Sequence, residues 1–188
     1  MTQPVHIRPA RPFDAAFAVP LVQATVGRIG LALTGAASDT EAARVLLGFF
    51  PLAGNRLSHR NTLIAEGPGG PLGLAVAYPG SEAEALDAPF HERLRALGLP
   101  DRIDPEATPG ELYLDTLAVA QGARGRGVGG LLLGTVAARA RDLSLPRVGL
   151  LAGAENRAAR LYERHGYRAV GERVVAGERY RHLVLDLT

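Results

Sequence analysis

The sequence contains no cysteine, and this absence excludes several kinds of chemistry. Without a thiol the protein forms no disulfide and holds no metal ion through thiolate ligands. It cannot carry an acyl group on cysteine either, so a transfer reaction must pass directly between substrates or use another nucleophile. The five histidines are scattered without metal-ligand spacing, and we therefore predict no metal site.

Lysine and tryptophan are absent as well, and all 21 basic residues are arginines. We attribute this bias to the base composition of the genome rather than to function. Because 19 acidic residues balance the arginines, the net charge of +2 gives no general attraction to nucleic acid or membranes. No apolar run is long enough to span a bilayer, and the N-terminus lacks the basic and then apolar pattern of a secretory signal. We predict a cytoplasmic protein with neither nucleic-acid nor membrane partners.

The most informative stretch of the sequence is a glycine-rich turn, Arg124-Gly-Arg-Gly-Val-Gly-Gly130. Residues 111–119, which precede it, are rich in aliphatic and aromatic side chains and predict a strand. The apolar residues that follow recur at helical spacing and predict an amphipathic helix: Val128, Leu132, Val136, Ala140 and Leu143. Such a turn points backbone amides at a ligand from the positive end of the helix dipole, and its glycines allow close approach. The sequence therefore predicts a phosphate site.

Two well-known phosphate loops fit this turn poorly. A P-loop needs Lys and then Ser or Thr after its last glycine, but Leu131 and Leu132 stand there. The dinucleotide fingerprint GxGxxG is met by Gly125, Gly127 and Gly130. However, the chain after the turn is too short for the usual doubly wound sheet, and no acidic residue closes the next strand. A dinucleotide-binding oxidoreductase is therefore a weak alternative.

A third pattern fits both the turn and its surroundings. Arg124-x-x-Gly127-x-Gly129 resembles the (Gln/Arg)-x-x-Gly-x-(Gly/Ala) pyrophosphate loop of the GCN5-related N-acetyltransferases, the GNAT superfamily. Downstream, residues 156–167 resemble the second segment of that family, with its Asn, Leu-Tyr and Gly-Tyr. Upstream, Leu114–Val119 is similar to the strand that holds the acetyl and pantetheine arm. The three segments stand in the order of the family.

The resemblance implies an α/β (α+β) fold, a mixed, mainly antiparallel sheet of about seven strands flanked by helices. One domain covers residues 1–188, with residues 79–110 as an insertion between the third and fourth strands. We interpret this insertion as a lid over the acceptor site, a dimer contact or a plain surface excursion. In the family, the strands that correspond to residues 116–119 and 148–151 splay apart, and the pantetheine arm of the cosubstrate lies between them.

The cosubstrate implied by the resemblance is acetyl-CoA. The main chain of Leu117 and Val119 would bond to the pantetheine arm, and the amides of the turn would face the pyrophosphate. Asn156 is predicted both to contact the cosubstrate and to cap the helix that follows it. The cosubstrate-binding residues implied are Leu117, Ala118, Val119, Arg124, Gly125, Arg126, Gly127, Val128, Gly129, Gly130, Asn156 and Ala159.

Two catalytic residues are predicted. Tyr162 matches the family position that often protonates the sulfur of the coenzyme, although a half-buried core tyrosine would give the same pattern. Tyr113, Asp115 and Leu117 should alternate onto one face of their strand. Tyr113 stands where some family members carry a glutamate base, so that role does not transfer. Asp115 is the candidate to accept a proton through water or to bind a cationic substrate.

The implied activity is direct transfer of an acetyl group from acetyl-CoA to a primary amine of a small molecule or peptide. The alternative is a non-catalytic acyl-CoA-binding sensor or assembly protein of the same fold. Edge strands in this family often pair, so a homodimer is a further expectation.

Overall fold

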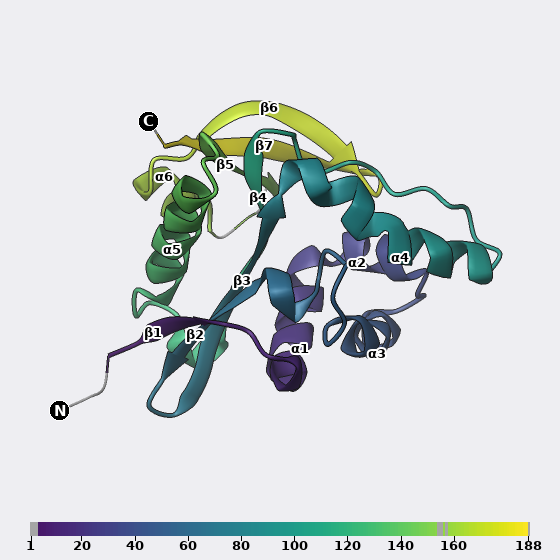
Figure 1. Ribbon diagram of the computed structural model, residues 1–188, viewed down its shortest axis with the longest axis horizontal. Helices are drawn as coiled ribbons and strands as arrows, with labels where there is room; N and C mark the ends of the chain where they lie inside the picture. The colour runs from purple at the N-terminus through teal and green to yellow at the C-terminus, as the bar shows by residue number, and fades with distance from the viewer. Residues whose placement is uncertain (1–3, 154–155, 157, 188) are drawn as a thin grey trace.

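The structure is a computed structural model that describes residues 4–153, 156 and 158–187. Its centre is one sheet of seven strands in the order β1-β2-β3-β4-β5-β7-β6 (Figure 1). The strands are β1 (His6–Pro9), β2 (Thr62–Gly67), β3 (Gly70–Pro79), β4 (Glu111–Val119), β5 (Arg147–Gly153), β6 (Arg168–Val175) and β7 (Glu178–Asp186). Only β4 and β5 are parallel neighbours. The predicted mixed, mainly antiparallel sheet is confirmed.

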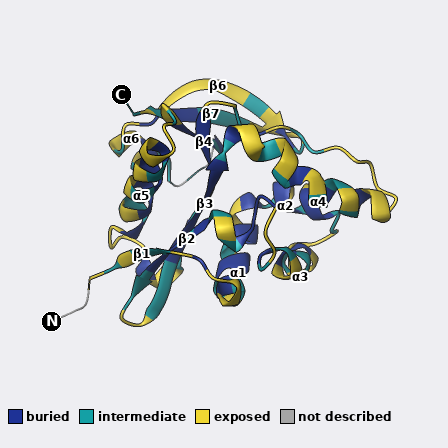
Figure 2. Ribbon diagram, in the orientation of Figure 1, coloured by how far each residue is buried: buried dark blue, intermediate teal, exposed yellow. Residues whose placement is uncertain are grey.

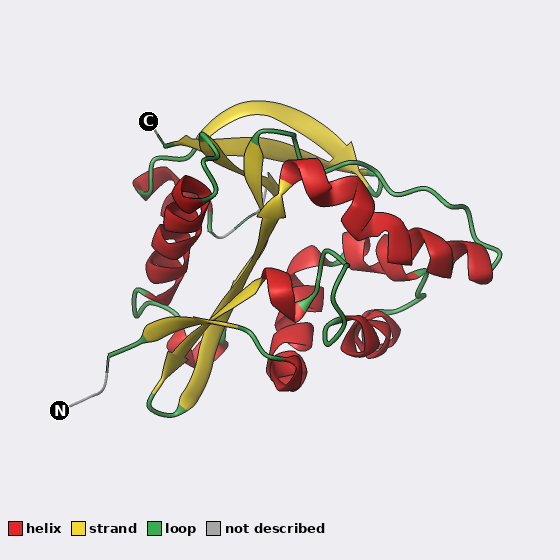
Figure 3. Ribbon diagram, viewed as in Figure 1, coloured by secondary structure: helices red, strands yellow, loops and turns green. Residues whose placement is uncertain are grey.

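Helices cover the two faces of the sheet unequally (Figure 3). The helices α5 and α6 lie on one face, and α1 to α4 lie on the other (Figure 1). Their bounds are α1 (Ala15–Val26), α2 (Arg28–Thr34), α3 (Asp39–Phe49), α4 (Ala83–Ala96), α5 (Val128–Asp142) and α6 (Ala159–Arg164). Each face has its own cluster of buried apolar side chains. The sheet therefore separates two cores.

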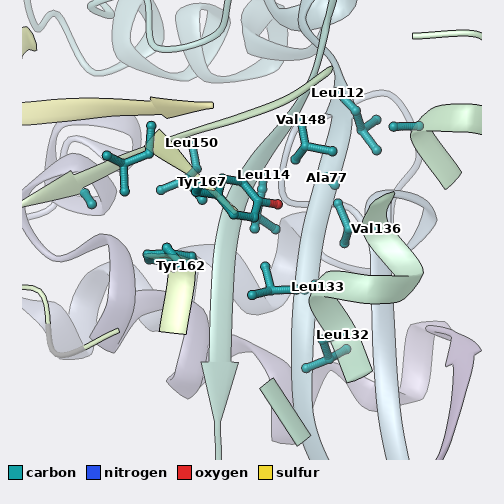
Figure 4. Close-up of a cluster of buried hydrophobic side chains, with 14 of the residues drawn as sticks. Ala77, Leu112, Leu114, Leu132, Leu133, Val136, Val148, Leu150, Tyr162 and Tyr167 are labelled. Atoms are coloured by element: carbon teal, nitrogen blue, oxygen red, sulfur yellow. The ribbon is translucent and has the colours of Figure 1, made fainter. Parts of the chain in front are cut away.

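The first core lies under α5, whose apolar stripe was predicted from its spacing (Figure 4). Val128, Leu132, Val136 and Ala140 are each no more than 1% exposed, which confirms that part of the prediction. Leu143, assigned to the same stripe, follows the helix end and is 46% exposed, so that assignment is wrong. Tyr162 of α6 and the neighbouring Tyr167 complete this core. Their rings meet edge to face, with the ring centroids 5.7 Å apart.

A β-bulge in β4 changes which side chains share a face. Thr116 pairs with Val76 on β3, whereas Leu114 pairs with the next residue, Ala77, so Asp115 is the extra residue. The predicted alternation of Tyr113, Asp115 and Leu117 onto one face is therefore wrong for Leu117. That side chain packs against the core under α5, while Tyr113 points to the other face, toward Tyr78. The bulge brings Asp115 beside residues of the second face.

The parallel junction between β4 and β5 is short. Its register comprises three pairs, which join 111–113 to 147–149. Beyond Tyr113 the two strands diverge, β4 staying paired with β3 and β5 with β7. At the junction, a side chain on Gly149 would collide with the buried carboxylate of Glu111, which bonds to His182 Nε2 at 3.0 Å. The predicted splay of the two strands is thus present.

The helices α1 and α2 form a bent pair on the second face. Pro20 lies inside α1 and does not end the helix. The chain turns at Gly27, whose φ of 50° and ψ of −118° suit glycine because a Cβ would be strained there. Val19, Val22 and Ile29, from both helices, are buried in the second core.

Within the described residues, no single helix is long and apolar enough to cross a membrane. The segments Pro12–Val26 and Arg28–Thr34 together have the length and composition, but they meet at a bend of 111°.

The insertion of residues 79–110 contains α4 and a returning segment. The ring of Phe90 in α4 stacks on that of Phe49 in α3, with the ring centroids 4.6 Å apart. The outer face of α4 is exposed (Figure 2). The returning segment, residues 99–110, is called the strap below. Arg173 of β6 fastens it by donating hydrogen bonds to the carbonyl oxygen of Glu106 (2.6 Å) and to the hydroxyl of Thr108 (2.5 Å). The strap is therefore tied to the sheet beside the point where β4 and β5 diverge.

Candidate active site

A cavity of about 850 Å³ occupies the place where β4 and β5 diverge. On one face of the sheet it is lined by the glycine turn, the start of α5 and Tyr162. On the other face it is lined by Leu21 and Val26 of α1, Ile29 of α2 and Glu106 of the strap. The cavity therefore passes through the sheet and joins the two faces.

The glycine turn forms one end of this cavity. Gly125 and Gly127 have φ values of 74° and 80°, which glycine adopts without strain, and no atom lies within 4 Å of where a Cβ would stand. In α5 the amide of Leu131 donates to the carbonyl of Gly127 at 3.1 Å. The amides of residues 128–130 precede that bond and have no earlier carbonyl in the helix. The turn thus offers several donors at the positive end of the dipole.

The last two glycines of the turn serve packing rather than a special backbone conformation. A Cβ on Gly129 would lie 3.0 Å from a methyl group of Leu161, and one on Gly130 would lie 3.0 Å from His165 Nε2. Both neighbours belong to α6 or its end. The missing side chains let α6 approach the start of α5, which brings Tyr162 to the cavity.

The arginines of the turn differ in position. Arg124 lines the cavity, and its Nε donates to the carbonyl oxygen of Val119 at 3.2 Å. Arg126 is exposed and does not line the cavity. Both lie beside the exposed donors of the turn.

The main chain of β4 faces the gap at the predicted residues. The amide of Ala120 donates to Leu72 on β3 at 2.8 Å. Because successive amides of a strand point in opposite directions, those of Val119 and Leu117 point away from β3 and toward the gap. Leu117, Ala118 and Val119 all line the cavity.

Tyr162 lies between the core and the cavity. Its side chain lines the cavity although the residue is only 6% exposed. Burial raises the pKa of its hydroxyl to about 12, so the group keeps its proton at neutral pH. It can therefore donate a proton but is a poor base in the resting protein.

Asn156 and Ala159 flank the start of α6. Asn156 lines the cavity, and its Oδ1 accepts a hydrogen bond from the amide of Ala158 at 2.8 Å. The prediction that Asn156 caps the helix is wrong, because α6 begins at Ala159 with Ala158 as its N-cap, and Asn156 caps only the turn before it. Ala158 also lines the cavity, whereas Ala159 lines a smaller recess of about 150 Å³ beside Tyr167.

Asp115 belongs to a buried cluster of charges at the far end of the cavity. Its Oδ2 accepts from Arg56 Nε (2.9 Å) and Nη2 (2.6 Å) and from the hydroxyl of Tyr78 (3.0 Å). Its Oδ1 accepts from Thr116 Oγ1 at 3.1 Å. Arg56 itself is 2% exposed. The carboxylate predicted as a base is therefore already engaged by several donors.

Two further carboxylates meet the same arginine. Arg56 Nη2 donates to Glu106 Oε1 at 2.6 Å, and Nη1 donates to Asp87 Oδ1 at 3.4 Å. The other oxygen of Glu106 accepts from the hydroxyl of Tyr113 at 3.0 Å. Burial raises the pKa of both Glu106 and Asp87. One cation thus faces three carboxylates, of which Glu106 and Asp115 line the cavity.

No sequence motif marks Arg56 or Glu106 as a site residue. Arg56 lies in a loop, and Glu106 stands beside Pro105 in a segment without a motif. Among the described residues, no group of three or more His, Asp and Glu side chains is arranged to hold a metal ion.

Comparison with known proteins identifies the family. The model of the acetyltransferase (GNAT) family matches residues 40–167, more than half of the chain. This chain therefore belongs to the GNAT family and is an acetyltransferase. The family uses acetyl-CoA and acetylates amine acceptors.

Solved structures have the same fold. One, described as an acetyltransferase, shares 27% identity over 97% of this chain and 100% of its own, with a TM-score of 0.77. An N-acetyltransferase from Staphylococcus aureus Mu50 shares 23% identity over 96% of this chain and 100% of its own, with a TM-score of 0.81. A comparison with curated proteins gives no match.

Proposed function

We propose that this acetyltransferase transfers the acetyl group of acetyl-CoA directly to a primary amine. The observation that carries the proposal is the cavity that crosses the sheet. It connects an anion-binding turn on one face to a buried cluster of carboxylates on the other. An anionic cosubstrate and a cationic acceptor can thus approach one another from opposite faces.

The residues of the first face suit a molecule with a pyrophosphate and an extended arm. The open glycines and the amides at the start of α5 would hold the phosphates, with Arg124, Arg126 and Asn156 beside them. The main chain of Leu117 and Val119 would bond to the arm in the gap. Acetyl-CoA supplies an acetyl group activated as a thioester when it is bound.

Tyr162 is proposed as the proton donor to the leaving sulfur. Its raised pKa keeps the hydroxyl protonated, and its position on the cavity wall lets it reach the gap. The amine nitrogen forms the new bond to the acetyl carbon while the carbon–sulfur bond breaks. The sulfur then takes the proton of the tyrosine, and a proton from the nitrogen restores the hydroxyl.

For Asp115 we propose the second of its two predicted roles, attraction of a cationic substrate. Its oxygens already accept from Arg56, Tyr78 and Thr116, which leaves little room for proton transfer. Its negative charge favours an ammonium group at this end of the cavity.

Calorimetric titration with acetyl-CoA, CoA and NADH, followed by an amine acetylation assay, tests this function. We expect acetyl-CoA to bind with micromolar affinity. Gly127→Val places a side chain in the open turn at positive φ and should weaken binding about tenfold or more, a loss of at least about 1.4 kcal/mol. Gly134→Ala, on the exposed face of α5 where nothing lies within 4 Å, is the matched control and should bind normally.

Two other outcomes would contradict the proposal. Binding of NADH without either form of coenzyme A would indicate the dinucleotide alternative. Binding of acetyl-CoA without acetylation of any amine would favour the non-catalytic sensor. The homodimer and the cytoplasmic location stay predictions.

A further inference from the structure

Two of the three carboxylates around Arg56, Asp87 and Glu106, lie in residues 79–110. Of these two, Glu106 lines the cavity and Asp87 does not. The strap carries Glu106 there, and Arg173 fixes the strap through the carbonyl of Glu106 itself. A Cβ on Gly80 would collide with the carbonyl of Thr108, so this glycine lets the strap pass close to the end of β3. The position of Glu106 is therefore set by packing and hydrogen bonds on both sides.

The hydrogen bonds of Glu106 leave it more able to accept a proton than Asp115. Glu106 accepts one bond on each oxygen, from Arg56 and Tyr113. A carboxylate has about four acceptor sites, so both oxygens can still receive a proton. Asp115 accepts three bonds on a single oxygen. Asp87 bonds to Arg56 but does not line the cavity.

The charges around Glu106 are unbalanced. Three carboxylates surround one guanidinium, and a buried excess of negative charge is relieved by a bound cation or an added proton. An incoming ammonium group supplies both the positive charge and the proton. The titratable groups that face Glu106 are Arg56, Tyr78, Asp87, Tyr113, Asp115 and Tyr180, and Arg173 binds its main chain.

Apart from Thr25 of α1 and the hydroxyl of Tyr180, the rest of the acceptor end is lined mainly by apolar side chains. Leu21, Val26 and Ile29 line it from α1 and α2, and Leu151 lines it from β5. Tyr180 of β7 lines it as well. Burial of an apolar group here stabilises binding by about 25 cal/mol per Å² of surface removed from water. A substrate with several charged groups would lose the water around those groups against this wall without gaining ion-pair partners.

We infer that Glu106 accepts the proton of the incoming amine and that this amine is carried on an apolar group packed against α1 and α2. The inference rests on the proposed function and names its acceptor class. The ammonium gives one proton to Glu106, and the neutral nitrogen then bonds to the acetyl carbon as described above. Glu106 afterwards releases its proton to water, so that the reaction yields the amide, the free thiol and one proton.

The experiment measures kcat/KM against pH with n-hexylamine, 2-phenylethylamine and spermidine as acceptors. Hexylamine and phenylethylamine should exceed spermidine by about tenfold or more, since each 1.4 kcal/mol of apolar burial gives a factor of ten. Activity should rise with pH through the raised pKa of Glu106 because the carboxylate must first lose its proton. In the unsubstituted protein this acidic limb should level off above that pKa. In Glu106→Gln kcat/KM should be lowered about a hundredfold or more and should keep rising with the neutral fraction of the amine, whose own pKa is about 10.

Two more variants separate proton transfer from a structural role. Tyr113→Phe removes a hydrogen bond that favours the charged carboxylate, so the acidic limb should move to higher pH without disappearing. Asp87→Asn removes a carboxylate of the same cluster that does not line the cavity, and the limb should be retained. Circular dichroism confirms that each variant is folded.

The outcomes distinguish this inference from the function on which it rests. If acetyl-CoA binds but spermidine is preferred, or if the activity of Glu106→Gln levels off at the same pH as that of the unsubstituted protein, the inference is overturned while the acetyltransferase function stands. The inference is also overturned if acetyl-CoA binds and neither apolar amine is acetylated. If acetyl-CoA does not bind, both fail.

Discussion

Arg56 joins three distant parts of the chain at one guanidinium. It comes from the loop before β2, and its partners are Asp87 of α4, Glu106 of the strap and Asp115 of β4. A buried arginine of this kind adds little net stability compared with an apolar core, but its removal leaves buried charges without a partner. The pairing therefore fixes the geometry of the acceptor end.

We predict that Arg56→Gln destabilises the protein by about 3–5 kcal/mol at pH 8. Burial already raises the pKa of Glu106 and Asp87, and loss of the guanidinium raises it further. A raised pKa in the folded state means that stability falls as pH rises through it, so the defect should shrink toward pH 5.5. Urea unfolding at both pH values measures this.

The exposed Arg44 of α3 provides the control, since Arg44→Gln should change the free energy of unfolding by no more than about 0.5 kcal/mol at either pH. A loss in Arg56→Gln that is equal at pH 8 and pH 5.5 would contradict the account of the carboxylates.

These residues also mark the limit of sequence interpretation. The glycines, Tyr162 and Asn156 stand in short contiguous patterns. The structure brings every predicted site residue except Arg126 and Ala159 to one cavity. Arg56 and Glu106 are 50 residues apart, and Arg56 and Asp115 are 59 apart. No local pattern encodes such contacts, because they arise only when the sheet and the strap are in place.

At the scale of elements, the sequence predicted features that follow from local periodicity. It missed features that depend on how one strand or helix pairs with another. The stripe of α5 followed from its own spacing, whereas the bulge at Asp115 depends on the register with β3. Pro20 lies inside α1, whose Val19 and Val22 are buried in the second core, and the chain turns at Gly27.

We predict that Gly27→Ala lowers the free energy of unfolding by about 1–3 kcal/mol, since its backbone conformation disfavours a Cβ. Steric overlap does not cause this loss of stability, because nothing lies within 4 Å of the Cβ position. Gly134→Ala, in the exposed middle of α5 with equal space, should instead stabilise by about 0.5–1 kcal/mol. Urea denaturation of both variants measures the contrast. Similar behaviour of the two would show that the conformation at Gly27 is not maintained.

At the scale of the whole molecule, the sheet consists of two parts that meet at a short junction. The strands β1 to β4 form one part, and β5, β7 and β6 form the other. Three register pairs and the helix α5, which packs on β3, β4 and β5, hold them together. Within the residues that the structure describes, the gap beyond that junction leaves one edge of β4 without a strand partner from Leu114 onward.

We predict that coenzyme A at 100 times its Kd slows amide hydrogen exchange on both sides of this gap. A ligand that binds only the native state stabilises it by about 2.7 kcal/mol at this concentration. Amides that exchange only after an opening which releases the ligand should therefore exchange about a hundredfold more slowly. Hydrogen exchange with mass spectrometry should show the effect in β4 and β5 alike. In the Gly127→Val variant, which binds about tenfold more weakly, exchange at the same concentration should slow only about tenfold. Protection confined to the glycine turn would mean that the arm does not lie in the gap.

The passage through the sheet also has a kinetic consequence. In the proposed function, each substrate would reach the reaction centre from its own face, so neither one would block the route of the other. The chain has no cysteine to store an acetyl group between two half-reactions. Initial-velocity plots at several fixed amine concentrations should therefore give lines that intersect, as for a ternary complex, and not the parallel lines of a double displacement.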